Sequence, residues 1–102
     1  MFIARVTGNV VTTQKVTKMS GRKMLLVDPL LVDEKKLALT STGKTYVVVD
    51  SLGAGAGELV LVTQGSSARM TDGTSDAPVD CVVIGIIDNI NVPKGVVYEK
   101  GE

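Results

Sequence analysis

The chain is divided into short apolar runs rich in valine, isoleucine and leucine, and the breaks between them fall at glycine, proline and polar residues. Runs of this length and β-branched content are typical of strands. A turn at residues 91–95 returns the chain into a short strand at 96–98. The pattern predicts one all-β domain over residues 1–102: a small five-stranded Greek-key barrel like the oligonucleotide-binding (OB) fold, with a short helical turn and a C-terminal β-hairpin. The expected strands of the barrel are residues 2–11, 24–32, 45–50, 58–63 and 80–92.

Several residues predict irregular strands. Pro29 has no amide to donate, so it must lie at a bulge, a bend or an edge. Gly8 loosens the first strand, and Gly85 indicates a kink or a close backbone contact in the last long one. Residues 33–39 fit a helical turn or a solvated loop equally well. The short helical turn is expected near Met70, after a serine cap.

Several predicted strands are runs of apolar residues without the polar residues that would be expected at every second position. A small barrel buries one face of its sheet and exposes the other, which normally produces alternating apolar and polar residues. Since few helices are available to cover an apolar outer face, other copies of the chain are the expected cover. The continuous runs are residues 47–49, 59–62, 82–84 and 86–87.

Three glycines alternate with alanine directly before one of these runs, at Gly53, Gly55 and Gly57. A dinucleotide-binding fingerprint is excluded because Glu58 occupies the position of its third glycine and a strand follows instead of a helix. A phosphate loop at Gly43 is excluded too, since its first glycine is missing and a strand follows. Two interpretations of the three glycines stay open. They allow another subunit to approach closely near a symmetry axis, or they form a loop whose backbone needs positive φ angles.

Composition excludes several classes of function. Formal net charge is zero and only three residues are aromatic, which argues against nucleic acid as a partner. Histidine is absent and Cys81 is the only cysteine, so no metal site, cofactor or catalytic group is expected. Cys81 is expected to be a small buried hydrophobe in a reducing compartment. We expect neither a signal peptide nor a membrane partner, because no apolar run is long enough to span a bilayer.

Together, these motifs resemble the bacterial microcompartment vertex proteins of the carboxysome and ethanolamine-utilisation (CcmL/EutN) type, and the resemblance covers nearly the whole chain. Each fragment is weak alone, but their order and spacing are specific. The matching fragments are IARVTG at 3–8, VVTTQK at 10–15, KMLLV at 23–27, VDSLGAGAGE at 49–58, LVLV at 59–62 with GSSAR at 65–69, PVD at 78–80 and VIGIID at 83–88.

The resemblance implies a structural protein rather than an enzyme. Family members form homopentamers that close the fivefold corners of a polyhedral shell in the cytoplasm, beside hexameric or pseudohexameric tile proteins. A flat sheet of hexagonal tiles cannot close without such corners, and a cyclic interface of five copies supplies one. The alternative function is an OB-like module that binds a small ligand or nucleic acid.

Arg69 is the most specific of the candidate interface residues. It follows two serines and an alanine at an expected helix start, which favours a two-pronged hydrogen bond to a carboxylate or to backbone carbonyls. Asp80 and Asp88 are its candidate partners, and a solvated arginine is the alternative. Glu58 either caps the loop, pairs across the interface or ends a strand in solvent. The full set of candidates for the subunit interface or the fivefold axis is Ser51, Gly53, Ala54, Gly55, Gly57, Glu58, Ser66, Ser67, Arg69, Asp80 and Asp88.

Overall fold

The computed structural model describes residues 1–13, 22–65 and 80–101, and every regular element in these segments is a strand. The prediction of an all-β chain is therefore confirmed. Among the described residues, no helix is long and apolar enough to cross a membrane. The strands are β1 (Phe2–Val10), β2 (Lys23–Asp33), β3 (Ala38–Ser41), β4 (Tyr46–Asp50), β5 (Leu59–Gln64), β6 (Cys81–Ile86), β7 (Asn89–Val92) and β8 (Gly95–Glu99).

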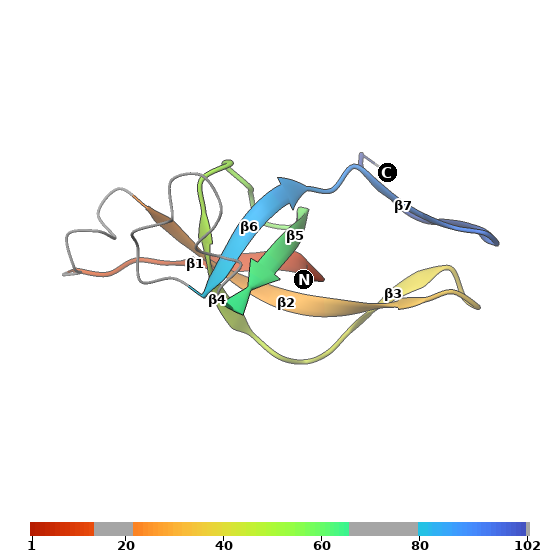
Figure 1. Cartoon of the computed structure of the whole chain (residues 1–102), viewed down its shortest axis with the longest axis horizontal. Helices are drawn as coiled ribbons and strands as arrows, with labels where there is room; N and C mark the ends of the chain where they lie inside the picture. Colours follow the sequence, from red (N-terminus) through yellow and green to blue (C-terminus); the bar gives the residue numbers. More distant parts are fainter. Residues whose placement is uncertain (14–21, 66–79, 102) are drawn as a thin grey trace.

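The predicted barrel is closed by strand β1, which pairs with both β5 and β2 (Figure 1). The strand order around the barrel is β1-β5-β6-β4-β2 and back to β1, with β3 added at the outer end of β2. All neighbours are antiparallel except β4 and β6, which meet in parallel at Val49 and Val82. The five-stranded OB-like barrel is confirmed.

The core lies inside this barrel. On β1, Ala4 and Val6 point inward and are almost completely buried, while Arg5 between them faces outward. Phe2 and Tyr46 lie at one end, where their rings meet edge-on at 5.5 Å and 73°. The two strands that carry these rings are both antiparallel to β2, so they start at the same end of the barrel. The core side chains are Ala4, Val6, Leu25, Val27, Val48, Ala54, Val60, Val62 and Val83.

The strand irregularities fall where the sequence predicted them. On one edge, β2 pairs with β4 before Pro29 and with β3 after it. Pro29 lies in the gap between these two pairings, so the backbone amide that it lacks is not needed for a hydrogen bond between strands there. The register between β1 and β2 shifts just before Gly8, and that between β5 and β6 shifts beside Gly85. In both places one extra residue, Thr7 or Ile84, is accommodated as a bulge.

Two expectations about the strands need correction. Strand β3 was not predicted; residues 34–37 form a tight, largely exposed turn that joins β2 to β3, which agrees with the solvated loop that was one of the two alternatives for residues 33–39. The carboxylate of Asp33 holds this turn by accepting hydrogen bonds from the amides of Lys35 and Lys36, each at 3.0 Å. The predicted strand 80–92 is two strands, because the chain leaves the barrel after Ile86 and β7 pairs with β8 alone. The helical turn expected near Met70 lies outside the described residues.

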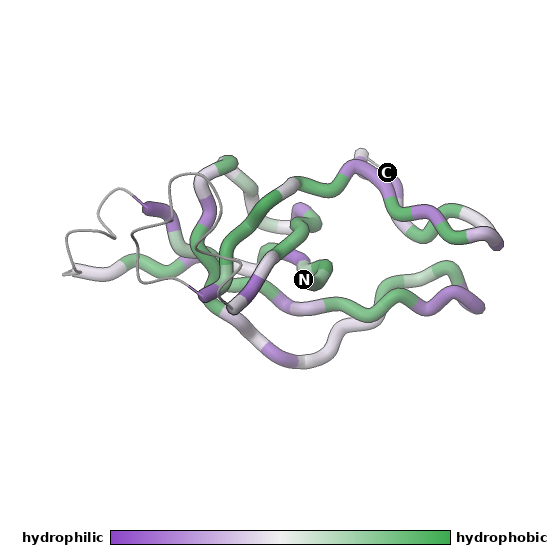
Figure 2. Tube along the Cα trace, viewed as in Figure 1, coloured by the Kyte–Doolittle hydropathy of each residue, from purple (hydrophilic) through white to green (hydrophobic). Residues whose placement is uncertain are grey.

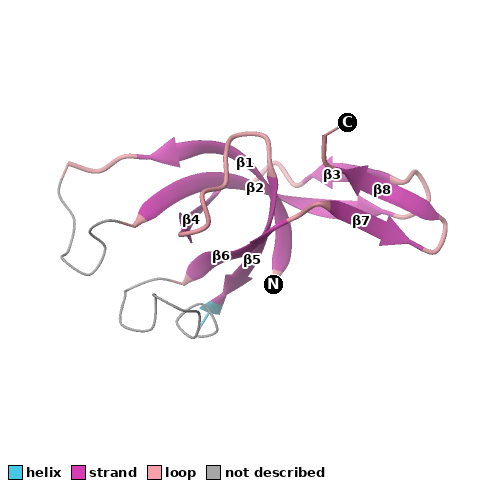
Figure 3. Ribbon diagram, turned by 90° about the horizontal axis from the view of Figure 1, so that it is seen from above, coloured by secondary structure: helices cyan, strands magenta, loops and turns pink. Residues whose placement is uncertain are grey.

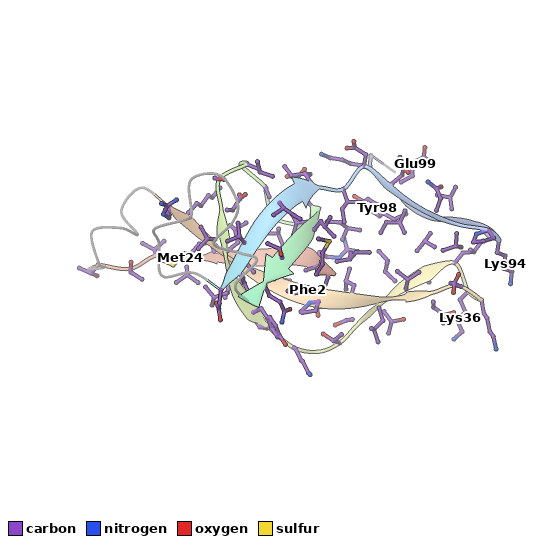
Figure 4. The ribbon with its side chains drawn as sticks, in the orientation of Figure 1. Phe2, Met24, Lys36, Lys94, Tyr98 and Glu99 are labelled. Atoms are coloured by element: carbon purple, nitrogen blue, oxygen red, sulfur yellow. The ribbon has the colours of Figure 1, made fainter. Side chains whose placement is uncertain are left out.

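Two hairpins, β2–β3 and β7–β8, project from the same end of the barrel and make the molecule long, with extents of 47 × 25 × 23 Å (Figures 1 and 3). We call this pair of hairpins the arm. At its tip, the Nζ of Lys94 donates to the carbonyl of Lys35 at 2.9 Å. Leu37 packs so closely on Gly95 that a Cβ there would be 2.9 Å from its Cδ1. Tyr98 lies between the two hairpins (Figure 4). The predicted C-terminal hairpin is confirmed.

Candidate subunit interface

The glycine loop, residues 51–58, joins β4 to β5 and begins with a buried carboxylate. Asp50, the last residue of β4, is only 2 % exposed. Its Oδ1 accepts a hydrogen bond from the amide of Leu52 at 2.8 Å, and its Oδ2 accepts from Gly53 at 3.1 Å and Ala54 at 2.8 Å. A carboxylate that gathers successive amides in this way forces the chain to turn sharply. Asp50 therefore fixes the first half of the loop.

The loop glycines do not all serve the same purpose. Gly53 and Gly57 have φ angles of 84° and 87°, which residues with a side chain rarely adopt. No atom would lie within 4 Å of a Cβ at either position, so both face open space. Gly55 lacks a positive φ and lies close to Glu58 instead. Ala54 is 1 % exposed and belongs to the core of its own subunit. Ser51 is exposed.

Glu58 closes the second half of the loop. Its Oε1 accepts a hydrogen bond from the amide of Gly55 at 2.6 Å, and its Oε2 forms an ion pair with the Nζ of Lys100 at 2.8 Å. The hydrogen bond from Lys100, followed by that from Gly55, lowers the pKa of the Glu58 carboxyl. Within one subunit, Glu58 thus acts as a cap of its own loop, by accepting the hydrogen bond from the Gly55 amide.

The loop is also fastened to β1. The amide of Gly57 donates to the carbonyl of Val6 at 2.8 Å, and the amide of Val6 donates to the carbonyl of Glu58 at 2.9 Å. The guanidinium of Arg5 reaches the carbonyl of Gly57 at 3.2 Å. These contacts hold the loop over one end of the barrel, beside a hollow of about 220 Å³. The hollow is lined by Val6, Gly8, Asn9, Lys23, Leu25, Ala54, Gly55 and Ala56.

The candidate partners of Arg69 lie at opposite ends of β6. Asp80 comes just before this strand, and its carbonyl accepts a hydrogen bond from the amide of Gly65 at 2.8 Å. Asp88 follows the strand, and its carbonyl accepts from the amide of Lys100 at 2.8 Å. Both aspartates are exposed, and one arginine of a single subunit cannot bridge to both of them. Arg69, Ser66 and Ser67 lie outside the described residues, so their roles stay predictions.

An apolar stripe crosses the outer wall of the barrel, as the continuous strands predicted. Ile3 of β1 pairs with Leu61 of β5, which lies beside the β6 bulge that carries Ile84. The neighbours of Ile3 and Leu61 along their strands point into the core, so these two side chains face outward, and Ile84 is exposed at the bulge. Ile84 is 36 % exposed, and Ile3 and Leu61 are half-buried. We call these three residues the outer stripe. Figure 2 shows that hydrophobic positions continue along the barrel strands and both hairpins. The most exposed large hydrophobic residues are Met1, Val11, Leu31, Val47, Leu52 and Val96.

Within the described segments, no group of three or more histidine, cysteine, aspartate or glutamate side chains could hold a metal ion. Cys81 is half-buried and packs against the core, so it is less enclosed than expected. Burial, together with the neighbouring charge of Asp80, raises the pKa of its thiol. The thiol is therefore protonated and a poor nucleophile at neutral pH.

Known proteins share both the sequence and the barrel. The model of the family described as ethanolamine utilisation protein EutN/carboxysome matches residues 1–88. The chain belongs to this family. It is 43 % identical over 100 residues to the carboxysome shell vertex protein CcmL of Synechocystis, covering 98 % of this chain and 95 % of that protein. It is 45 % identical over 91 residues to the shell vertex protein PduN of Salmonella typhimurium, covering 89 % of this chain and 99 % of that protein.

Solved structures agree with the sequence comparisons. The structure of Gloeobacter violaceus CcmL superposes with a TM-score of 0.86 at 42 % identity, and each chain is covered completely. A structure described as the pentameric microcompartment shell protein GrpN of Rhodospirillum rubrum superposes with a TM-score of 0.76 at 43 % identity. This alignment covers 90 % of the present chain and 99 % of GrpN. The family resemblance seen in the sequence is thus confirmed.

Two residues that build the site, Asp50 and Lys100, are not singled out by sequence reasoning. An aspartate at the end of a strand, two residues before a glycine-rich turn, is a local signal for the turn that Asp50 makes. No comparable signal exists for Lys100, because its partner Glu58 is far away in the chain and only the fold brings them together.

Proposed function

We propose that this chain is a structural shell protein of a bacterial microcompartment and that it forms homopentamers at the fivefold vertices of the shell. The observation that carries the proposal is the match to GrpN, described as pentameric, over 90 % of the present chain. The shared fold and 43 % identity over this length support the same mode of assembly.

The outer stripe supplies a physical reason for assembly. In a ring, each subunit presents two different surfaces, one to each neighbour. An outward apolar stripe on Ile3, Leu61 and Ile84 is unfavourable in water and becomes favourable when a neighbouring copy covers it. The glycine loop is an additional candidate contact, since Gly53 and Gly57 leave room for another backbone to approach.

Hexameric or pseudohexameric tile proteins are the other proposed partners, and the shell in the cytoplasm is the proposed location. A pentamer is useful only where hexagonal tiles must curve into a closed body. We propose a structural role without catalysis, because relatives such as CcmL and PduN are named as shell vertex proteins. An OB-like binding module is the less favoured alternative, since zero net charge provides no electrostatic attraction for nucleic acid.

Co-expression with hexameric tile proteins tests the proposal. With the chain present, electron microscopy should show closed polyhedral particles that contain it as a minor component. Without the chain, the same tiles should form sheets, tubes or particles with open corners. Tiles that close equally well without this chain, or particles from which it is absent, would contradict the vertex role.

A further inference from the structure

One carboxylate contacts two parts of the molecule that are far apart in the sequence. Glu58 directs Oε1 to the amide of Gly55 in the glycine loop and Oε2 to the ammonium of Lys100 at the base of the arm. Because both oxygens belong to one rigid planar group, a rotation that breaks one contact also disturbs the other. Glu58 is half-buried, so its position is limited by its surroundings.

The second half of the glycine loop depends on this carboxylate more than the first half does. The amides of Leu52, Gly53 and Ala54 are held by the buried Asp50. The amide of Gly55 is held by the side chain of Glu58. The same loop therefore contains amides that should respond to Glu58 and amides that should not.

The C-terminal hairpin of the arm is attached to the barrel by few contacts. Strand β7 starts directly after Asp88, whose carbonyl accepts the hydrogen bond from the amide of Lys100. The ion pair with Glu58 then ties the same lysine to the loop. At the far end, the hairpin meets β2–β3 through Lys94 and Gly95. An isolated two-stranded hairpin is marginally stable in water, so these attachments determine where it lies.

We infer that Glu58 is a positioning residue that couples the conformation of the glycine loop to the position of the C-terminal hairpin through Lys100. Release of the hairpin frees the carboxylate and loosens Gly55, and a change at Gly55 loosens the hairpin in return. The proposal concerns the subunit and does not depend on the number of copies in the assembly.

The charges around the pair favour its intact form. The hydrogen bond to Glu58 and the charge of that carboxylate raise the pKa of the Lys100 ammonium, and Asp88 and Tyr98 add to this effect. Both partners therefore stay charged at neutral pH, and the coupling is active there.

Amide hydrogen exchange of the intact protein, followed residue by residue by NMR, tests the coupling. Lys100→Met removes the charge and keeps much of the length, Lys100→Arg restores a cation, and Lys44→Met is the control, since Lys44 lies in the loop before β4. In Lys100→Met the Gly55 amide should exchange about two- to fivefold faster, the range that corresponds to an exposed ion pair. The amides held by Asp50 should keep their rates, and Lys100→Arg and Lys44→Met should resemble the parent.

Glu58→Gln tests the reverse direction. Its side-chain oxygen can still accept from Gly55, but it carries no charge for Lys100. The amide of Lys100 should then exchange faster, while Gly55 changes less than it does in Lys100→Met. An unchanged Gly55 rate in Lys100→Met would overturn the inference. So would equal acceleration of the amides held by Asp50, or a Lys100→Arg variant that behaves like Lys100→Met.

Discussion

Replacement of Asp50 tests whether a buried carboxylate organises the glycine loop. A hydrogen bond to a charged acceptor contributes ~1.5–3 kcal/mol. The contributions of the three hydrogen bonds to Asp50 do not simply add, because Leu52 and Gly53 are exposed and their amides can bind water instead. Ala54 is buried, so the weaker hydrogen bond from its amide to a neutral acceptor carries most of the cost. In Asp50→Asn, the single oxygen can serve the two amides at Oδ2, while the new NH₂ group faces the amide of Leu52. We therefore expect a loss of ~2–4 kcal/mol in the free energy of unfolding.

The assay is urea denaturation followed by circular dichroism, at one subunit concentration for all variants because assembly adds to apparent stability. Asp88→Asn is the matched control: it removes an exposed carboxylate and should change the unfolding free energy by less than ~0.5 kcal/mol. An Asp50→Asn protein as stable as this control would refute the role assigned to Asp50.

Three further predictions concern pH and assembly. The pKa of Glu58 is lower in the folded protein than in the unfolded chain, so its carboxylate stabilises the fold above the ordinary glutamate pKa. This stabilisation is lost as the pH falls through the pKa of the folded state. Glu58→Gln should therefore make the unfolding free energy depend less on pH in this range. Ile84→Asp should lower the assembled mass on dilution, whereas Val96→Asp, on the arm, should leave the mass unchanged. If Val96→Asp lowers the mass and Ile84→Asp does not, the outer stripe is not a subunit contact. Arg69→Ala should weaken assembly by ~2–5 kcal/mol per interface while the barrel stays folded, and Arg69→Lys should restore assembly only in part. If both variants assemble as well as the parent, Arg69 is a solvated side chain and the interface role is wrong.

The barrel strands could be predicted because their formation depends on local composition. Runs of β-branched residues mark them, and glycine or proline marks where the ladder is interrupted, as at Gly8, Pro29 and Gly85. Strand β3 could not be predicted, since residues 38–41 are few and lack a strong pattern. It forms because β2 extends beyond the barrel and offers a free edge. The division of residues 80–92 into two strands also depends on partners: β6 follows β5 only as far as Ile86.

The backbone of the glycine loop could be predicted where its geometry alone decides, whereas the interface role of its residues stays a prediction. The alternating glycines predicted a loop that needs positive φ, and Gly53 and Gly57 have it. Gly55 and Ala54 differ because their environments are set by Glu58 and by the core. The pairing of Glu58 with Lys100 joins residues that are far apart in the sequence, so no local pattern indicates it.

The mass of the purified particle tests the central claim most directly. Native mass spectrometry, combined with light scattering over a dilution series, measures how many copies associate. For a homopentamer we expect five times the 10.7 kDa of one chain, maintained at micromolar concentration. A monomer, a dimer or a ring of six at that concentration would contradict it.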